Sequence, residues 1–497
     1  MIMPQHLQWT TRLCVLAVFF PLGGAAAAEA TDYLRVVRAY ADAMIEHGRD
    51  VYGSEHSPLF AAALDRETLR LPSKQPPGVP GIREHDRATA GANPMHHENL
   101  YQVLYALSEV TGQPRYAREA DKALAWFFEH CQSEATGLLA WGEHIRWDFR
   151  TEGPADKRHG MIHEYFRPWV LMPRCFELAP DAAERFARGV WLHQIADHKT
   201  GDFSRHARFD AHGPGRHNQY PRHGGFYIAT WAEAYRRTED PVFLTAIETV
   251  LGFYERHRSP TSGAIPAEIG NARSNGNMLW PSSNLSLAVD LWDGADKVPD
   301  PLAERMRASA RKTDAAFLRL PHQLGPDGQG FITQGNVHRL AAEDVRGAGK
   351  PIYAGPWATG YGFGMEARAA ALCAVRHRQV PEAGYRRLVL ASADRYLTRD
   401  PPPEAVLYPA TLAHAVWLML DAERLTGEAK YLDRADHFAD MAMQVLFTPG
   451  CPLPKASSHH DHYEAITRAD TFVAALLRLW CRHNRPAAQR LLEFCDR

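Results

Sequence analysis

The chain has 497 residues, with 56 Lys and Arg against 58 Asp and Glu, and a formal net charge of −2. This balance excludes the strongly basic surface with which proteins bind nucleic acid, and it provides no general attraction to an acidic polymer, so an anionic substrate must be held by local groups. The length allows two domains or one large repetitive domain. The 26 His and 12 Trp supply titratable groups, metal ligands and stacking surfaces that suit carbohydrate enzymes.

The N-terminal residues 1–30 predict a secretory signal. Arg12 precedes the apolar run "LCVLAVFFPLGG", and the small residues of "AAAAEA" follow it. We expect the mature chain to begin near Glu29 or Thr31 and to be periplasmic or secreted. No other segment approaches the roughly 18 consecutive apolar residues that span a membrane. We therefore expect no membrane association after the signal is removed.

Apolar periodicity of about 3.6 residues predicts helices along the rest of the chain, while strand alternation is scarce. The predicted helices cover 32–48, 161–178, 182–198, 283–293, 303–319, 363–375, 384–396, 409–424 and 465–482.

A self-similar unit recurs at 107–130, 231–257 and 417–447. Each copy has an apolar helix ending near Thr-Gly or its equivalent, a short polar turn and a second amphipathic helix, which predicts a helical hairpin. Hairpins of this kind bury their inner faces by closing around an axis. We expect an all-α fold, an α/α barrel of about six or seven hairpins forming one catalytic domain over 31–497. A solenoid is less favoured, because the copies are irregularly spaced and no capping repeat is visible.

Long loops rich in Gly, Pro, His and Trp separate the helices and are expected to build a cleft at one end of the barrel. They cover 68–97, 131–160, 199–225, 258–282, 320–358 and 448–464. Six cysteines remain after the signal, without CxxC spacing, and several lie in helical patterns as small core residues. Disulfides are left open.

Three short motifs in the first half of the chain carry groups that bind divalent ions. "AWGEHIRWD" contains Glu143 and His144, "HGMIHEYFRPW" contains His163 and Glu164, and "DFSRH" contains Arg205 and His206. Imidazole and carboxylate together suit Mn²⁺ or Zn²⁺. A single His in a loop is usually structural, so only the joint occurrence favours a metal site. His159 and His163 would share one helix turn, a spacing seen at zinc sites, but the HExxH pattern is missing.

The segments "HGRDVYGSEHSPLF", "TGLLAWGEHIRWD", the "HE" that follows and "DFSRH" resemble family 2 pectate lyases over residues 40–260. The resemblance implies an α/α barrel that cleaves by β-elimination. In that family a His, a Glu about twenty residues later and a His about forty further on bind a divalent metal, and the Arg before the last His is the base. Here His144, Glu164 and His206 are separated by 20 and 42 residues. The resemblance therefore implies these three as ligands of a divalent metal and Arg205 as base. We expect Mn²⁺ to be preferred over Mg²⁺, because imidazole ligands suit Mn²⁺ and the later metals.

Two departures from the family concern the substrate more than the fold. Tyr165 and Phe166 follow the "HE" where the family has Leu and Lys, and "MHHENLYQVL" stands in place of a Gln-rich segment. They leave open a uronate other than galacturonate, or a sister family in which the site residues are shifted. We expect an acidic polysaccharide or oligosaccharide as substrate, with pectate as the first choice.

Arginine is an unusual base, because its guanidinium is ordinarily protonated. A nearby divalent cation and desolvation both favour the neutral form, so Arg205 beside His206 is placed where its pKa could fall. The alternative is that Arg205 binds a substrate carboxylate as a cation, in which case His163, Tyr165 or another group takes the proton.

Other polar and aromatic residues of the predicted loops and their flanks are candidates for substrate binding. The motif "SSHHDHYEAIT" has the composition of a second metal site, but we interpret it as a cleft loop. The substrate-binding candidates are His97, His163, Arg167, Tyr220, Trp357 and His460.

Two other functions remain open. An α/α-barrel glycoside hydrolase, such as an unsaturated glucuronyl hydrolase, would use carboxyl groups without a metal, and its candidates are Glu98, Asp148, Glu164 and Asp210. A non-catalytic carbohydrate-binding protein would depend on the aromatic residues alone. Metal dependence separates the first alternative from the lyase, and turnover excludes the second.

Overall fold

The computed structural model describes residues 32–156, 160–212, 215–274 and 276–497. Tyr33–Arg497 forms one compact unit. The predicted signal, residues 1–30, and His159 lie outside the described residues.

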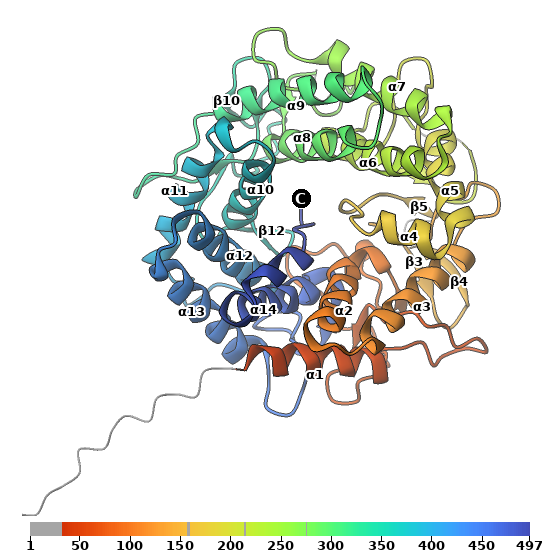
Figure 1. Cartoon of the computed structure of the whole chain (residues 1–497), viewed down its shortest axis with the longest axis vertical. Coiled ribbons are helices and arrows are strands. Elements are labelled where there is room, and N and C mark those ends of the chain that lie inside the picture. The colour runs from red at the N-terminus through yellow and green to blue at the C-terminus, as the bar shows by residue number, and fades with distance from the viewer. Residues whose placement is uncertain (1–31, 157–159, 213–214, 275) are drawn as a thin grey trace, which may run out of the picture. The chain divides into compact units, whose positions relative to one another are not determined.

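The helices of this unit form two concentric rings (Figure 1). Contacts run through the inner ring from α4 by way of α6, α8, α10, α12 and α14 to α2, and α3 packs on both α2 and α4. Each inner helix pairs with an outer one, and α1 packs on α14. Over the residues that the structure describes there are seven such pairs, so the predicted α/α barrel is confirmed. The inner helices are α2 (Glu98–Thr111), α4 (Met172–Leu178), α6 (Pro221–Thr238), α8 (Pro281–Ala295), α10 (Met365–Gln379), α12 (Pro409–Thr426) and α14 (Ala469–Asn484). The outer helices are α1 (Tyr33–Glu46), α3 (Arg115–His130), α5 (Pro180–Gly189), α7 (Pro241–His257), α9 (Leu302–Leu318), α11 (Tyr385–Leu397) and α13 (Ala429–Leu446).

The hairpin turns form for local reasons. Gly112 ends α2 and Gly427 ends α12, with φ of 70° and 72°, a left-handed conformation that glycine adopts without steric cost. In the middle copy Glu239 takes this conformation with φ of 56°. The next helix, α7, begins with the Asp240 side chain accepting a hydrogen bond from the Val242 amide at 2.8 Å.

The predicted helix over 161–178 is wrong in its first part, because only Met172–Leu178 is helical. Met161 has a φ of +42°, and Ile162–His163 forms the short strand β5, which pairs with β6 (Ala207–Arg208). His163 and Glu164 therefore lie on extended backbone, and the helical spacing expected for a zinc pair is absent at His163.

Short strands and 3₁₀ turns occupy the long segments between the rings. The other strands are β1 (Ala63–Leu64), β2 (Gly91–Ala92), β3 (Ile145–Asp148), β4 (Gly153–Asp156), β7 (Met278–Leu279), β8 (Phe331–Ile332), β9 (Gly335–Asn336), β10 (Ala341–Ala342), β11 (Tyr353–Ala354), β12 (Thr359–Gly360), β13 (Phe363–Gly364) and β14 (Tyr463–Glu464). The 3₁₀ helices are η1 (Glu84–Asp86), η2 (Pro94–His97), η4 (Pro381–Ala383), η5 (Ala465–Thr467) and η6 (Pro486–Leu491), and η3 (Val190–Gln194) is a π-helical turn. All these elements are small, so helices alone form the framework.

The segment that precedes each inner helix is longer than the segment that follows it. The segments before α2, α4, α6, α8, α10 and α14 are long, whereas α2 reaches α3 through residues 112–114 and α12 reaches α13 through 427–428. Since each inner helix runs antiparallel to its outer partner, the long segments gather at one end of the barrel. That end is where loop residues distant in sequence converge.

The C-terminal residues enter the centre of the ring (Figure 1). Asp496 is buried and lies 3.4 Å from Arg167 Nη1 and 3.0 Å from His414 Nε2. Arg167 also faces the buried carboxylates of Glu98 at 3.9 Å and Asp470 at 3.8 Å. Arg167 is therefore a structural cation of the barrel interior, which argues against the predicted contact with substrate.

The six described cysteines are all free, and five of them are buried. Burial raises the pKa of Cys175 to about 12, as expected for a small core residue rather than a reactive thiol.

Candidate metal centre and its surroundings

The long segments before α4 and α6 bring four ligand-type side chains together. Glu143, His144, Glu164 and His206 each offer one atom, and these atoms all lie within 4.8 Å of one another. We call these four residues the His–Glu cluster. His206 Nε2 lies 2.6 Å from Glu164 Oε2, and His144 Nε2 lies 3.2 Å from His206 Nε2. The structure thus places His144, Glu164 and His206 at one point, and their role as ligands stays a prediction.

Backbone pairing explains how the cluster is held. Gly142 forms a parallel bridge with Glu164, and the Glu143 amide donates to the Glu164 carbonyl at 3.2 Å. A Cβ on Gly142, whose φ is +106°, would lie 1.8 Å from that carbonyl oxygen. In β5 and β6, His163 pairs with Ala207, which sets the next residue, Glu164, beside His206. Glycine is required at 142 because two segments of the backbone come into contact there.

Asp86 orients the first imidazole. Its Oδ1 lies 2.6 Å from His144 Nδ1, and its Oδ2 accepts hydrogen bonds from Arg83 Nε at 2.6 Å and from the Tyr361 hydroxyl. The carboxylate favours a proton on Nδ1, which leaves the lone pair of Nε2 directed at the cluster. Burial lowers the pKa of His144 and outweighs the opposing effect of Asp86, so the imidazole stays neutral as a metal ligand must.

Glu164 is an ionised carboxylate in a buried position. Its Oε1 accepts from His223 Nε2 at 3.1 Å and lies 3.0 Å from Arg205 Nε. Burial alone would raise the pKa of Glu164, but the charge of Arg205 and hydrogen bonds from His206 and His223 hold it well below its usual range. The negative charge is available at neutral pH.

The donor set fits a divalent ion. Two imidazole nitrogens and a charged carboxylate oxygen converge, and the second imidazole has Asn218 at its far nitrogen, with 3.3 Å between Asn218 Nδ2 and His206 Nδ1. Two nitrogens only 3.2 Å apart are readily explained if both face one cation. A second set formed by His85, Asp86 and His144 shares one imidazole with the cluster.

Arg205 lies against the cluster, in partly buried surroundings. Besides Glu164, it donates from Nη1 to Asn218 Oδ1 at 2.6 Å, and its guanidinium carbon is 4.7 Å from the centre of the Tyr220 ring. Burial lowers the pKa of Arg205, but the charges of Glu164, Tyr220 and Glu268 outweigh burial, and the pKa is raised. Tyr220 in turn donates to Glu268 Oε1 at 2.9 Å. Tyr220, predicted to bind substrate, is thus positioned beside Arg205.

Three other substrate-binding candidates have structural partners. His97 is buried and lies 2.9 Å from the Tyr463 hydroxyl, and Trp357 donates to the Arg399 carbonyl at 2.9 Å. His163 is also buried, with 3.2 Å from its Nε2 to Trp141 Nε1 and 3.0 Å from its Nδ1 to Gln194 Oε1. These contacts argue against substrate binding by His97, His163 and Trp357.

His460 remains partly accessible, and its Nδ1 lies 2.7 Å from Ser457 Oγ. It does not belong to the His–Glu cluster. The motif around it forms no metal-binding group among the residues the structure covers, in agreement with its interpretation as a loop.

The hydrolase candidates do not form a second catalytic pair. Glu98 is fully buried and accepts from the Val170 amide, and burial raises its pKa to about 8. Asp148 accepts from Arg146 at 3.1 Å, and Asp210 pairs with Arg208 at 3.0 Å. Only Glu164 of the four joins the cluster.

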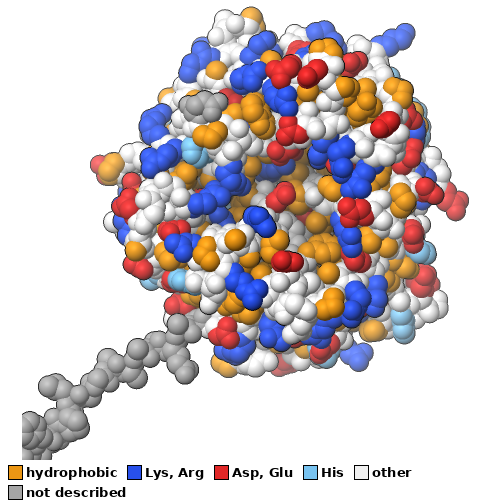
Figure 2. All heavy atoms as spheres, in the orientation of Figure 1, with side chains coloured by type: hydrophobic (Ala, Val, Ile, Leu, Met, Phe, Trp, Pro, Cys, Tyr) orange, Lys and Arg blue, Asp and Glu red, His pale blue; other side chains and the backbone are white. Residues whose placement is uncertain are grey.

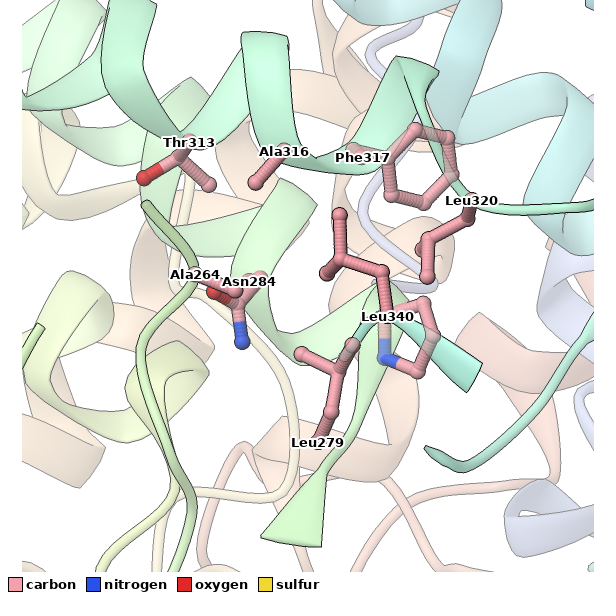
Figure 3. A pocket seen from close by; sticks show the side chains of 9 residues that line it. Ala264, Leu279, Asn284, Thr313, Ala316, Phe317, Leu320 and Leu340 are labelled. Carbon is pink, nitrogen blue, oxygen red and sulfur yellow. The ribbon is translucent and has the colours of Figure 1, made fainter. Parts of the chain in front are cut away.

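A separate pocket lies between α8 and α9 (Figure 3). Its lining is mainly apolar, and Asn284 is occupied by two hydrogen bonds of 2.9 Å with the Ile265 backbone. Because no titratable side chain lines this pocket, the His–Glu cluster is the better candidate for chemistry. Figure 2 shows the face of the ring seen in Figure 1, with basic and acidic side chains around its centre.

Sequence comparison decides which family the first half resembles. Residues 57–245 match the family model described as periplasmic pectate lyase. The match confirms the resemblance recognised from the motifs, includes every member of the His–Glu cluster together with Asp86 and Arg205, and supports a polysaccharide-acting enzyme.

Several solved structures are similar to this chain at low identity. They include a D-mannose isomerase (8% identity, 92% of this chain and 99% of that chain covered, TM-score 0.49). An unsaturated glucuronyl hydrolase from Streptococcus agalactiae has 10% identity, coverage of 91% and 94%, and a TM-score of 0.46. The GH76A alpha-1,6-mannanase from Salegentibacter sp. HEL1_6 has 11% identity, coverage of 93% and 100%, and a TM-score of 0.45. Among the described residues, no helix is long and apolar enough to cross a membrane.

Four residues near the cluster were missed from the sequence, namely Asp86, Asn218, Arg222 and His223. His85 and Asp86 stand together in "GIREHDRATA", and the loop was predicted to line the cleft, but nothing in the motif indicates that it meets His144. The remaining three belong to the segment just after "DFSRH" and to the start of α6. The polar residues in the segment that follows the predicted ligand motif "DFSRH" include these three.

Proposed function

We propose that this protein is a periplasmic or secreted lyase that cleaves a uronic-acid polymer or oligomer, pectate being the first choice, by metal-assisted β-elimination. The observation that carries the proposal is the convergence of His144, Glu164 and His206, with Arg205 on the same carboxylate. A hydrolase would need an acid and a base carboxyl group across the scissile bond. The partners found for Glu98, Asp148 and Asp210 do not support that arrangement.

His144, Glu164 and His206 would hold the ion, with Glu143 as a further oxygen donor. We propose Mn²⁺, because two imidazoles and a carboxylate suit it better than they suit Mg²⁺. When bound, the ion would act as a Lewis acid on the uronate carboxylate and stabilise the charge that develops during elimination.

Arg205 is the proposed base. In its neutral form, the Arg205 side chain would take the proton from the carbon next to the uronate carboxylate and become the guanidinium, while Tyr220 and Asn218 hold its orientation. The charge of Glu164 is the largest of the effects that raise the pKa of Arg205, and burial works in the opposite direction. Any loss of negative charge at Glu164 therefore moves Arg205 toward its neutral form.

The function is tested by following the ultraviolet absorbance of unsaturated products on polygalacturonate and other uronate polymers. We expect turnover that excess chelator abolishes and that Mn²⁺ restores better than Mg²⁺. Full activity in chelator would contradict the metal-assisted reaction. Release of saturated products, at a rate that excess chelator does not change, would favour the hydrolase.

The role of Arg205 is tested separately with Arg205→Lys. If Arg205 is the base, kcat falls by ~10²- to 10⁴-fold while the metal stays bound. If Arg205 only binds the substrate carboxylate, KM rises and kcat is nearly retained, because uniform binding is lost.

A further inference from the structure

A tyrosine from the second half of the chain reaches the carboxylate that orients His144. The Tyr361 hydroxyl donates to Asp86 Oδ2, and Asp86 Oδ1 lies 2.6 Å from His144 Nδ1. Burial, followed by the charge of Asp86, raises the pKa of Tyr361, so the hydroxyl keeps its proton and is the hydrogen-bond donor. Tyr361, Asp86 and His144 thus form a continuous series of contacts that ends at the His–Glu cluster.

Tyr361 lies outside residues 57–245, the span that matches the periplasmic pectate lyase family. It is in the loop of a hairpin formed by β12 and β13, in which Gly360 pairs with Phe363. The two loop residues, Tyr361 and Gly362, have φ of 56° and 75°, as in a type I′ turn. The hairpin therefore joins the second half of the barrel to the candidate metal centre.

The backbone of Tyr361 is strained. Glycine, asparagine or aspartate usually occupies the first loop position of a type I′ turn, because positive φ is sterically unfavourable for a bulky side chain. Residues in such a conformation persist where the surrounding structure fixes them, and they are frequent at functional sites. The strain at Tyr361 therefore indicates side-chain contacts that outweigh it.

The Tyr361 ring is fixed by contacts with two segments of the site. The ring of Phe166, two residues after Glu164, has its centre 5.7 Å from that of the Tyr361 ring. The guanidinium carbon of Arg83 lies 5.3 Å from the centre of the Tyr361 ring, and Arg83 Nε donates to Asp86 Oδ2 at 2.6 Å. Tyr361 therefore contacts both the segment that carries Asp86 and the segment that carries Glu164.

We propose that Tyr361 is a positioning residue of the metal centre, which holds Asp86 against His144 and so keeps Nε2 of that imidazole directed at the ion. The hydroxyl fixes Oδ2 of the carboxylate, and this fixes Oδ1 at Nδ1 of the imidazole. Partners behind a ligand imidazole set its orientation and affect its affinity for the metal. The inference rests on the proposed function in taking the cluster as a metal site, but it requires neither a uronate substrate nor the elimination step.

The test measures Mn²⁺ affinity, because this quantity does not depend on turnover. The full chain is freed of metal by chelator, dialysed and titrated with Mn²⁺ by calorimetry, as wild type, Tyr361→Phe and Tyr408→Phe. Tyr408 is a matched control, because it belongs to the small apolar cluster on which Tyr361 packs, and its hydroxyl donates to the Pro80 carbonyl at 2.7 Å. Tyr408→Phe therefore removes a hydrogen bond to the segment before η1 but none to Asp86.

The two variants should differ in metal affinity. Tyr361→Phe should weaken Mn²⁺ binding by about 3- to 10-fold, less than the roughly 10- to 100-fold expected for loss of the carboxylate itself. Tyr408→Phe should bind Mn²⁺ as wild type does. Both should be less stable in urea unfolding of the metal-free protein, since each loses a hydrogen bond. A merely structural role of Tyr361 would therefore not separate the two Mn²⁺ affinities.

A double variant tests whether Tyr361 acts through Asp86. In Asp86→Ala the hydroxyl has no carboxylate to hold, so the addition of Tyr361→Phe should leave the remaining Mn²⁺ affinity unchanged. The single and double variants are compared at raised protein concentration, because Asp86→Ala is expected to bind weakly. A further loss in the double variant, of the size that Tyr361→Phe causes in the wild type, would contradict positioning through Asp86.

Three other results overturn the proposal, namely no Mn²⁺ binding by the wild type, wild-type affinity in Tyr361→Phe, or equal losses in Tyr361→Phe and Tyr408→Phe. Failure of the proposed function gives a different result. If Tyr361→Phe selectively weakens Mn²⁺ binding but metal-loaded wild type yields no unsaturated product, the positioning role stands and the lyase activity does not. If turnover is abolished by chelator and Tyr361→Phe has wild-type affinity, the lyase stands and the positioning role does not.

Discussion

Replacement of Asp86 tests whether the His–Glu cluster is a metal centre. Asp86 is 2% exposed, and its Oδ1 lies 2.6 Å from His144 Nδ1. In Asp86→Asn an amide oxygen can still accept a hydrogen bond from Nδ1–H of His144. The negative charge that favours this tautomer and strengthens the imidazole as a ligand is lost. In Asp86→Ala both the acceptor and the charge are lost.

The magnitude follows from this difference. Loss of a carboxylate behind a metal-bound imidazole costs about 10- to 100-fold in metal affinity. We expect Asp86→Asn near the lower value, about 1.4 kcal/mol, and Asp86→Ala near the upper one, about 2.7 kcal/mol. Calorimetric titration of the chelator-treated protein with Mn²⁺ measures both.

The control is Asp148→Asn, in strand β3, which directly follows the proposed ligand His144. Asp148 accepts from the Arg150 amide at 3.1 Å and belongs to neither metal-binding group. It should bind Mn²⁺ as wild type does. If Asp86→Ala also retains wild-type affinity, His144 is not oriented by Asp86 toward an ion, and the reasoning from the carboxylate–imidazole pair is wrong.

Three further changes probe the supports of the site. Gly142→Ala should abolish Mn²⁺ binding and lower the free energy of unfolding by at least about 1 kcal/mol, because the new Cβ meets the Glu164 carbonyl; Gly384→Ala, also at positive φ but with no atom near its Cβ, should keep Mn²⁺ binding in the same titration. His163→Ala should reduce stability in urea unfolding by about 1–3 kcal/mol, since two buried partners lose a hydrogen bond, yet leave KM for substrate unchanged; a raised KM at full stability would return His163 to the substrate site. Asp496→Asn should destabilise by about 3–5 kcal/mol at pH 7, because buried arginines lose their partner. The pKa of Asp496 is lowered to about 2, by arginine charge and hydrogen bonds that outweigh burial, so its contribution is present above the unfolded pKa of about 3.9 and is lost as the pH falls through 2. The stability difference between wild type and Asp496→Asn should shrink over that interval, and a constant difference in urea unfolding at pH 7, 4 and 2.5 would contradict it.

The barrel could be predicted because its signals are local. Thr-Gly at the end of α2 and of α12 marks a left-handed turn within a few residues of the helix it closes. Apolar periodicity does the same for each helix. The prediction failed at 161–171, where the sequence is apolar enough for a helix, but Met161 has positive φ and the chain pairs with β6 instead.

The side-chain environment was harder to predict than the position of the motifs. His97, His163 and Trp357 have the composition of a sugar site, but composition does not show whether a side chain faces the cleft or the core, and the structure buries all three. Asp86 could not be assigned, because its partner His144 is 58 residues away and belongs to another loop. The spacing of His144, Glu164 and His206 was informative only through the resemblance to a known family.

The adjacency of Arg205 and His206 has a physical consequence in the folded chain. The two side chains contact the same carboxylate: Arg205 Nε lies at Oε1 of Glu164, and His206 Nε2 lies at Oε2. The negative charge of Glu164 keeps Arg205 protonated at Oε1. A cation bound at Oε2 would partly neutralise this charge and so lower the pKa of Arg205. By linkage the effect is reciprocal: loss of the proton from Arg205 would strengthen the hold of Glu164 on the cation by the same factor by which the cation favours that loss. The proposed base Arg205 and the proposed ligand His206, which are neighbours in sequence, can therefore be coupled through Glu164 without any movement of the backbone.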